Sequence, residues 1–143
     1  MKLYLDTSAL VKLYVEEEGS AMVQEALAAA ETVATATISY VEARAAFARR
    51  RREGRLSRQD YHHTVSELEA DWEQYVLLEI TRNVIRRAAD LTNIHPLRAY
   101  DAIHLASATA LKERIEGPIF FASWDSTLAS AAKREGLSLV PIR

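Results

Sequence analysis

The feature that most constrains this chain is a regular alternation between short apolar stretches and longer helical ones. Residues 33–38 are rich in β-branched side chains, and residues 119–122 read Ile-Phe-Phe-Ala. Such stretches are typical of buried strands. Parallel strands need long crossover connections, so the alternation predicts an α/β fold with a mainly parallel central sheet flanked by helices. About five short strands are expected, at residues 3–5, 33–38, 76–80, 119–122 and 137–142.

Between these strands the pattern predicts helices, and two consecutive ones form a protruding α-hairpin. The first runs from Ser39 to about Arg52 and is ended by Gly54, and the second begins near Ser57 and runs to about Glu73. The hairpin therefore covers about residues 39–73. Further helices are expected after residue 8 and over about 21–30, 81–92, 98–115 and 125–135.

Composition narrows the class of protein. The 143 residues are 49% hydrophobic and 27% charged, which fits a single domain over 1–143. There is no cysteine, which excludes thiol nucleophiles and zinc–thiolate sites. No apolar run is long enough to span a bilayer and no signal peptide is recognisable, so we expect a cytoplasmic protein. The net charge of −2 argues mildly against an extended nucleic-acid surface.

Three acidic residues follow the ends of expected strands. Asp6 comes after residues 3–5, Glu42 after residues 33–38 and Asp125 after residues 119–122. In parallel sheets, ligands bind outside the carboxyl ends of the strands. We therefore expect these three carboxylates to lie along one edge of the sheet.

Each of these acids also has a purely structural interpretation. Asp6 and Asp125 suit helix N-caps, and Ser39 with Glu42 matches a capping box. Asp101 is harder to explain, because it lies near the start of an apolar helix that predicts burial. A buried carboxylate is costly unless it is paired, hydrogen-bonded or bound to a metal.

The four acids together carry more information than each alone. Carboxylates that share a sheet edge repel one another, and a divalent cation relieves that repulsion. Oxygen ligands favour Mg²⁺ or Mn²⁺ over zinc. Such an ion activates water and stabilises charge in phosphoryl transfer. The set therefore predicts metal-dependent chemistry on a nucleic acid or nucleotide.

Four segments of the chain resemble the motifs of PIN domains, in the right order. In the opening segment, Asp6 is followed by Thr7-Ser8. The second carries Glu42 within residues 39–44, the third carries Asp101 within residues 100–108, and the last carries Asp125 within residues 121–128. The compact size and the arginine-tipped hairpin resemble the VapC-type toxins of toxin–antitoxin pairs.

The resemblance implies a Mg²⁺- or Mn²⁺-dependent endoribonuclease. Asp6, Glu42, Asp101 and Asp125 would hold one or two ions, and a metal-activated water would cleave RNA to leave a 5′-phosphate and a 3′-hydroxyl. The implied partners are an RNA substrate, a small antitoxin that covers the site, and a second copy in a homodimer. Trp124 departs mildly from the pattern, since smaller residues are common before the last acid.

Other side chains have two interpretations each. Thr7, Ser8 and Ser126 suit either the site or helix caps, and Arg44 suits either a site contact or the helix surface. His104, one turn beyond Asp101, is expected to be structural rather than catalytic. The stretch of arginines at the hairpin tip suits RNA, an antitoxin or solvent: Arg49, Arg50, Arg51 and Arg52, with Arg55 and Arg58 beyond. Several aromatic residues suit either core packing or a subunit interface: Phe47, Tyr61, Trp72 and Tyr75.

Rival functions are weaker but stay open. A non-nuclease phosphohydrolase with Asp6 as nucleophile usually has a second Asp two residues later, where this chain has Ser8. A phosphoacceptor switch needs an early acid pair and a late lysine, which are not found. Nothing in the sequence argues against a PIN-like module that acts in RNA processing without an antitoxin. A PIN-like module that has kept only a binding role is disfavoured by the presence of all four acids.

Overall fold

The computed structural model describes residues 1–141, which form seven helices and a five-stranded sheet. The strands are β1 (Lys2–Leu5), β2 (Thr32–Ala36), β3 (Val76–Leu78), β4 (Ile119–Ala122) and β5 (Ser138–Leu139). The helices are α1 (Thr7–Lys12), α2 (Ser20–Ala29), α3 (Ile38–Arg52), α4 (Arg58–Trp72), α5 (Arg82–Ile94), α6 (Ala99–Arg114) and α7 (Ser126–Arg134). None of the helices in this described part is both long and apolar enough to cross a bilayer.

The sheet is parallel throughout, in the order β3-β2-β1-β4-β5. The first strand of the chain is therefore the central one, and Tyr4 pairs with Ala34 on one side and Phe121 on the other. This arrangement confirms the predicted α/β class and its parallel sheet. It also puts the carboxyl ends of β1 and β4 side by side, since Leu5 pairs with Ala122.

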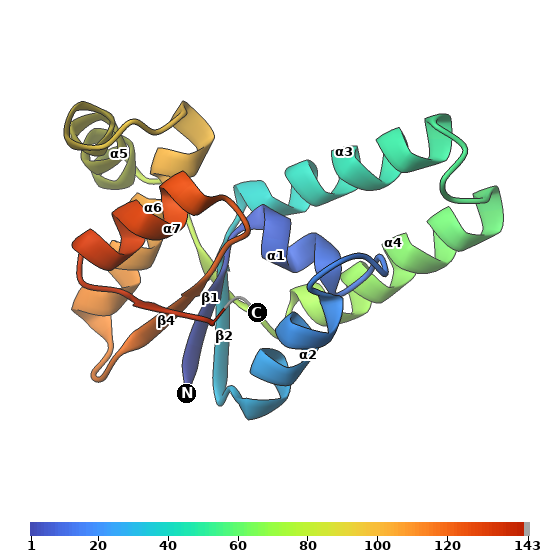
Figure 1. Ribbon diagram of the computed structural model, residues 1–143, viewed down its shortest axis with the longest axis horizontal. Helices are drawn as coiled ribbons and strands as arrows, with labels where there is room; N and C mark the ends of the chain where they lie inside the picture. Colours follow the sequence, from blue (N-terminus) through green and yellow to red (C-terminus); the bar gives the residue numbers. More distant parts are fainter. Residues whose placement is uncertain (142–143) are drawn as a thin grey trace.

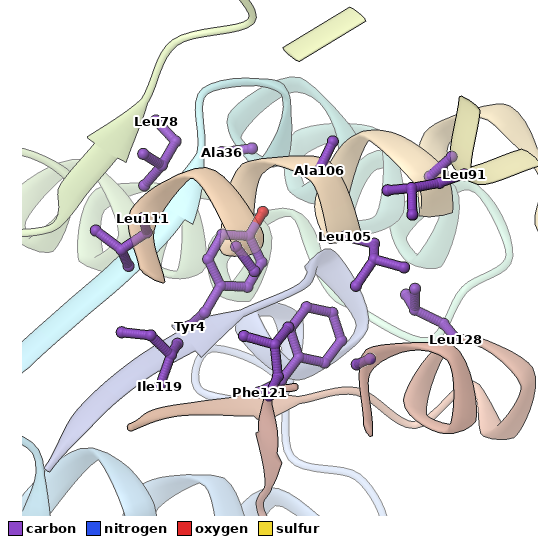
Figure 2. Packing of buried hydrophobic residues seen from close by; sticks show 14 of the residues in the cluster. Tyr4, Ala36, Leu78, Leu91, Leu105, Ala106, Leu111, Ile119, Phe121 and Leu128 are labelled. Carbon is purple, nitrogen blue, oxygen red and sulfur yellow. The ribbon is translucent and has the colours of Figure 1, made fainter. Parts of the chain in front are cut away.

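Each face of the sheet is covered by its own set of helices. Tyr4 and Phe121 point to the face covered by α5, α6 and α7, and their rings are stacked with centroids 5.4 Å apart. Figure 2 shows this pair beneath Leu105 of α6. Leu3 and Leu5 point to the other face, which packs on α1, α2, α3 and α4. The alternation along β1 follows from the two-residue repeat of a strand, and it buries both faces as parallel sheets require.

Helices α3 and α4 form the predicted hairpin, which extends away from the sheet in Figure 1. Phe47 and Leu68, one from each helix, are fully buried. Ser57 caps α4 by accepting from the Asp60 N–H at 3.0 Å. Gly54 has a φ of 76° at the turn, a conformation that favours glycine.

Some predicted boundaries are wrong. The second strand ends at Ala36, because the chain from Ile38 onward is already helical. The third ends at Leu78, and the last covers only Ser138–Leu139. Both are edge strands with one neighbour each, so fewer backbone bonds hold their ends in the sheet. Residue 142, the predicted end of the last strand, lies outside the described residues.

Candidate active site

Asp6 stands where β1 passes into α1, and it caps that helix. Its Oδ1 accepts hydrogen bonds from the Ala9 N–H at 2.9 Å and from the Ser8 hydroxyl at 2.7 Å. Its own N–H donates to the Ala122 carbonyl, which ties it to the end of β4. The side chain is almost fully buried, and burial raises its pKa despite the charge of His104 and hydrogen bonds from Ser123 and Ser8. The predicted cap and the predicted site position are thus the same residue.

Glu42 does not belong to a capping box. Ser39 lies inside α3 and bonds to the Thr35 hydroxyl at 2.6 Å, so it is no N-cap. The Glu42 carboxylate instead accepts from the Thr7 hydroxyl at 2.6 Å and lies 3.0 Å from His104 Nε2. Burial alone would raise the pKa of Glu42, but the hydrogen bonds from His104 and Thr7 outweigh it and lower that pKa.

His104 connects Glu42 to the centre of the sheet. The ring is 2% exposed, with Nδ1 2.9 Å from the Tyr4 hydroxyl and Nε2 3.1 Å from the Thr7 hydroxyl. Both ring nitrogens have partners, as expected for a structural histidine. One of those partners is a candidate site carboxylate, however. Local sequence gives no sign of this contact, because Glu42 and His104 are 62 positions apart.

Asp101 and Asp125 are joined by a residue that sequence analysis did not identify. Asp125 caps α7 through its Oδ1, which accepts from the Leu128 N–H at 3.0 Å. Asp101 is in the first turn of α6, and its side chain is 19% exposed, so the expected burial is wrong. The Arg98 guanidinium lies 3.2 Å from Asp101 Oδ2 and 3.4 Å from Asp125 Oδ2.

These contacts link all four acids around one region of the surface. Ser8 bonds to Asp6 and accepts from the Trp124 N–H at 3.1 Å, which leads to Asp125. The remaining links run through Arg98, the first two turns of α6, His104 and Thr7. The acids therefore surround the carboxyl ends of β1 and β4, next to the N-termini of α1, α3, α6 and α7. They encircle this region without touching, and no three acid or histidine side chains in residues 1–141 form a ready metal cluster.

The donor set nevertheless suits a hard divalent cation. All four side chains offer carboxylate oxygens, the ligands that Mg²⁺ and Mn²⁺ prefer. Asp6 is a buried carboxylate without an ion pair in the described part of the chain, and such a charge gains from a bound cation. Arg98 shows that the pair formed by Asp101 and Asp125 accepts positive charge between its two members.

Some of the other residues proposed from the sequence contact the four acids, and others do not. Thr7 donates to Glu42 and does not cap α1, so the capping interpretation is wrong. Ser126 is exposed, whereas Ser8 contacts Asp6 and Ser123 contacts Asp125, with the Ser123 hydroxyl accepting from the Asp125 N–H at 3.1 Å. Arg44 faces away, toward the Tyr40 hydroxyl at 2.9 Å and Glu69 at 3.9 Å.

The arginines at the hairpin tip have internal partners. Arg50 pairs with Glu17, which also binds Lys12 at 2.8 Å. Arg49 lies 3.7 Å from Glu53, and Arg51 lies over the Tyr61 ring at 5.6 Å. Arg52 at the end of α3 is exposed. Part of the basic stretch therefore braces the hairpin against the start of the chain, and its contact with RNA or an antitoxin stays a prediction.

The aromatic residues noted in the sequence pack largely in the core. Phe47 is completely buried, and Tyr61, Trp72 and Tyr75 are partly buried against the same cluster. Trp124 lies with its ring 4.9 Å from the Lys12 ammonium, so it packs beside α1.

The family model described as PIN domain matches residues 3–133, which include all four acids. This chain belongs to the PIN-domain family. It is 32% identical to Ribonuclease VapC45 of Mycobacterium tuberculosis, over 97% of this chain and 94% of that protein.

Two solved structures have a similar fold. One is a toxin–antitoxin complex from Klebsiella pneumoniae, with a TM-score of 0.63 and 20% identity over 90% of this chain and 91% of that one. The other is Mycobacterium tuberculosis VapC20, described as a sarcin–ricin loop cleaving toxin, with a TM-score of 0.65 and 15% identity over 91% of this chain and 95% of that one. At these identities, the likeness extends to the fold alone.

Proposed function

We propose that this chain is a metal-dependent endoribonuclease of the VapC type, acting as the toxin of a toxin–antitoxin pair. Asp6, Glu42, Asp101 and Asp125 form its active site in this proposal. The observation that carries it is the closed series of contacts through which four sequence-distant acids surround the ends of β1 and β4. The relatives named as ribonucleases support the reaction class.

The residues have distinct parts in this reaction. The four carboxylates would hold Mg²⁺ or Mn²⁺, which supplies positive charge at the phosphodiester and activates water for its hydrolysis. Thr7 and His104 fix the Glu42 carboxylate from two sides, so its direction is set before substrate arrives. Ser8 does the same for Asp6 and joins it to the loop before Asp125. Such preorganisation is the main contribution that a protein makes to metal-assisted phosphoryl transfer.

The first test is the loss of one carboxylate that does not cap a helix. Asp101→Asn keeps the shape of the side chain and removes its charge, and Asp101 makes no capping hydrogen bond. We expect RNA cleavage in Mn²⁺ to fall at least about 100-fold, since even residues that only orient metal ligands cost 10–100-fold. Cleavage of a labelled RNA, with 5′-phosphate ends checked by ligation, measures this.

Asp90→Asn is the matched control, because Asp90 is an exposed acid on α5 outside the candidate site. It should cleave like the original chain, and EDTA should stop both. Full activity of Asp101→Asn, with an unchanged thermal melt, would contradict the assignment of the site. Cleavage that survives EDTA would contradict metal dependence.

The antitoxin and the homodimer belong to the same proposal. Solved neighbours described as VapBC or as toxin–antitoxin complexes support a protein antitoxin. We expect an adjacent reading frame to encode a small protein that co-purifies with this chain and inhibits cleavage. Light scattering of the purified chain would measure the homodimer. An isolated gene with an active product would instead indicate RNA processing without an antitoxin.

A further inference from the structure

Arg98 holds a position that the proposed function does not explain. It is the residue before α6, and its side chain makes no capping bond to that helix. Its guanidinium instead reaches two acids from different elements, Asp101 in α6 and Asp125 before α7. Each acid uses its Oδ2 atom for this contact, while Asp125 Oδ1 is occupied by the cap of α7. Arg98 thus binds the oxygen of Asp125 that the helix cap leaves over for a ligand.

The Arg98 guanidinium lies on the solvent side of the two acids. The Arg98 side chain is 83% exposed, whereas those of Asp101 and Asp125 are 19% and 31% exposed. Within residues 1–141, these are the only ion pairs that either acid makes. The guanidinium therefore supplies the nearest positive charge to two carboxylates that would otherwise repel each other.

Such a contact is strong enough to form and weak enough to be replaced. Ion pairs with an exposed partner contribute little, because water screens them and the long side chain loses freedom. A divalent cation bound directly by carboxylate oxygens interacts far more strongly, so it would displace the guanidinium. The displaced group stays attached at the rim of the site. Its planar fork of N–H donors then suits the two unesterified oxygens of a phosphodiester.

We propose that Arg98 is a displaceable counter-ion: it neutralises Asp101 and Asp125 until a divalent metal binds, and then binds the phosphate of the RNA. This inference rests on the proposed function for the identity of the substrate. It gives Arg98 two successive partners: first the carboxylates of Asp101 and Asp125, and then the phosphate of the RNA. The consequence is that replacing Arg98 should strengthen metal binding and weaken RNA binding.

The test compares Arg98→Gln with Arg86→Gln, a matched control at an exposed arginine of α5 that makes no ion pair in the described part of the chain. Mn²⁺ binding is measured by calorimetry without RNA. We expect Arg98→Gln to bind Mn²⁺ about three to five times more tightly, because the ion no longer displaces an ion pair. Arg86→Gln should match the original chain, and Arg98→Lys, which keeps the charge without the fork, should lie between them.

RNA cleavage at saturating Mn²⁺ is the second measurement. Arg98→Gln should raise KM about tenfold, since a charge-assisted contact to phosphate is lost. A merely structural role for Arg98 would weaken both metal and RNA binding.

Equal or weaker Mn²⁺ affinity in Arg98→Gln would overturn the proposal, and so would an unchanged KM. If the original chain binds Mn²⁺ but cleaves no RNA, the nuclease proposal fails by itself and the phosphate step fails with it. The Mn²⁺ comparison would then still decide whether Arg98 is the counter-ion.

Discussion

Asp6 is a carboxylate that the fold buries at an energetic cost. It lies at the carboxyl end of the central strand, almost without solvent, and burial raises its pKa above the ordinary value of 3.8. Its hydrogen bonds from Ser8 and Ala9 compensate only partly. Ionised Asp6 therefore destabilises the metal-free protein at neutral pH, a pattern common at functional sites.

This cost predicts that Asp6→Asn stabilises the metal-free protein. The neutral amide has the same shape and still offers an oxygen to the Ala9 N–H, so the cap of α1 is kept. At pH 7 the free energy of unfolding should rise, because the variant no longer buries a carboxylate whose pKa is raised by burial. Urea unfolding in EDTA measures this difference.

The pH dependence of the difference follows from the direction of the shift. An acid whose pKa is raised by folding begins to destabilise the fold as pH rises above its unfolded value, and the cost is complete above its folded value. The advantage of Asp6→Asn should therefore disappear below about pH 3.8 and grow as the pH rises above that value. An advantage of constant size across this range would show that charge is not its cause.

The candidate acids were predictable one by one, but their partners were not. Asp6, Glu42 and Asp125 follow strand ends, and that position depends only on local pattern. Thr7, Arg98 and His104 contribute through contacts with residues up to 100 positions away. Such contacts depend on how the elements pack, which local sequence does not encode. Asp101 was expected to be buried because its helix is apolar, yet it lies at the end of that helix and reaches the surface.

At the scale of elements, the connection between α1 and α2 supports the loop that carries Asp125. Gly19 precedes α2 with a φ of 93°, and a Cβ on it would lie 2.6 Å from the Trp124 ring. Trp124 also contacts Lys12, and its N–H donates to Ser8. The tryptophan therefore rests on the glycine, directly beside a candidate site residue.

Replacement of Gly19 by alanine should be more costly than the same change at another turn. Gly19→Ala combines backbone strain with a collision against a rigid ring, for a loss of about 2–4 kcal/mol in the free energy of unfolding. Gly54→Ala is the control, because Gly54 also has a positive φ but no atom lies within 4 Å of the added carbon. It should lose only about 1–2 kcal/mol. Equal losses in the two variants, measured by urea unfolding, would rule out the Trp124 collision.

The helical hairpin was the element most fully predicted. The Ser57 cap of α4 and the glycine turn are local signals, and the observed bounds of α3 and α4 lie within a residue or two of the expected ones. The edge strands β3 and β5 were overestimated, because their length depends on a neighbouring strand.

At the scale of the whole molecule, the candidate site joins the two halves of the fold. Asp6 and Glu42 precede the hairpin turn, while Asp101 and Asp125 belong to the helices after it. A cation bound by all four acids would therefore link α1, α3, α6 and α7. Ligands that bind only the folded state stabilise it by mass action.

Binding of Mn²⁺ should accordingly raise the melting temperature. At about 100 times its Kd an ion contributes about 2.7 kcal/mol, which corresponds to a rise of about 10 °C for a chain of this size. Asp101→Asn should show a much smaller rise, and Asp90→Asn an equal one. Differential scanning calorimetry in EDTA and in Mn²⁺ measures these shifts. A melting temperature that ignores Mn²⁺ would mean that these acids do not form a metal site.

Alternating strands and helices predicted the fold class but not the order of the strands. The order β3-β2-β1-β4-β5 makes the first strand the centre of the sheet, flanked by β2 and β4. Many strand orders satisfy the same alternation, and the choice among them depends on how the helices cover the two faces. The site was thus predictable as an edge of the sheet, and the pairing of Asp6 with the end of β4 was not.

The pairing of β1 with β4 also has a consequence for synthesis of the protein. A chain translated only through α6 contains Asp6, Glu42 and Asp101, but neither the strand that lies beside β1 nor Asp125. On the proposed function, the nascent polypeptide would therefore lack a complete site. Activity would begin only after β4 has left the exit tunnel and docked.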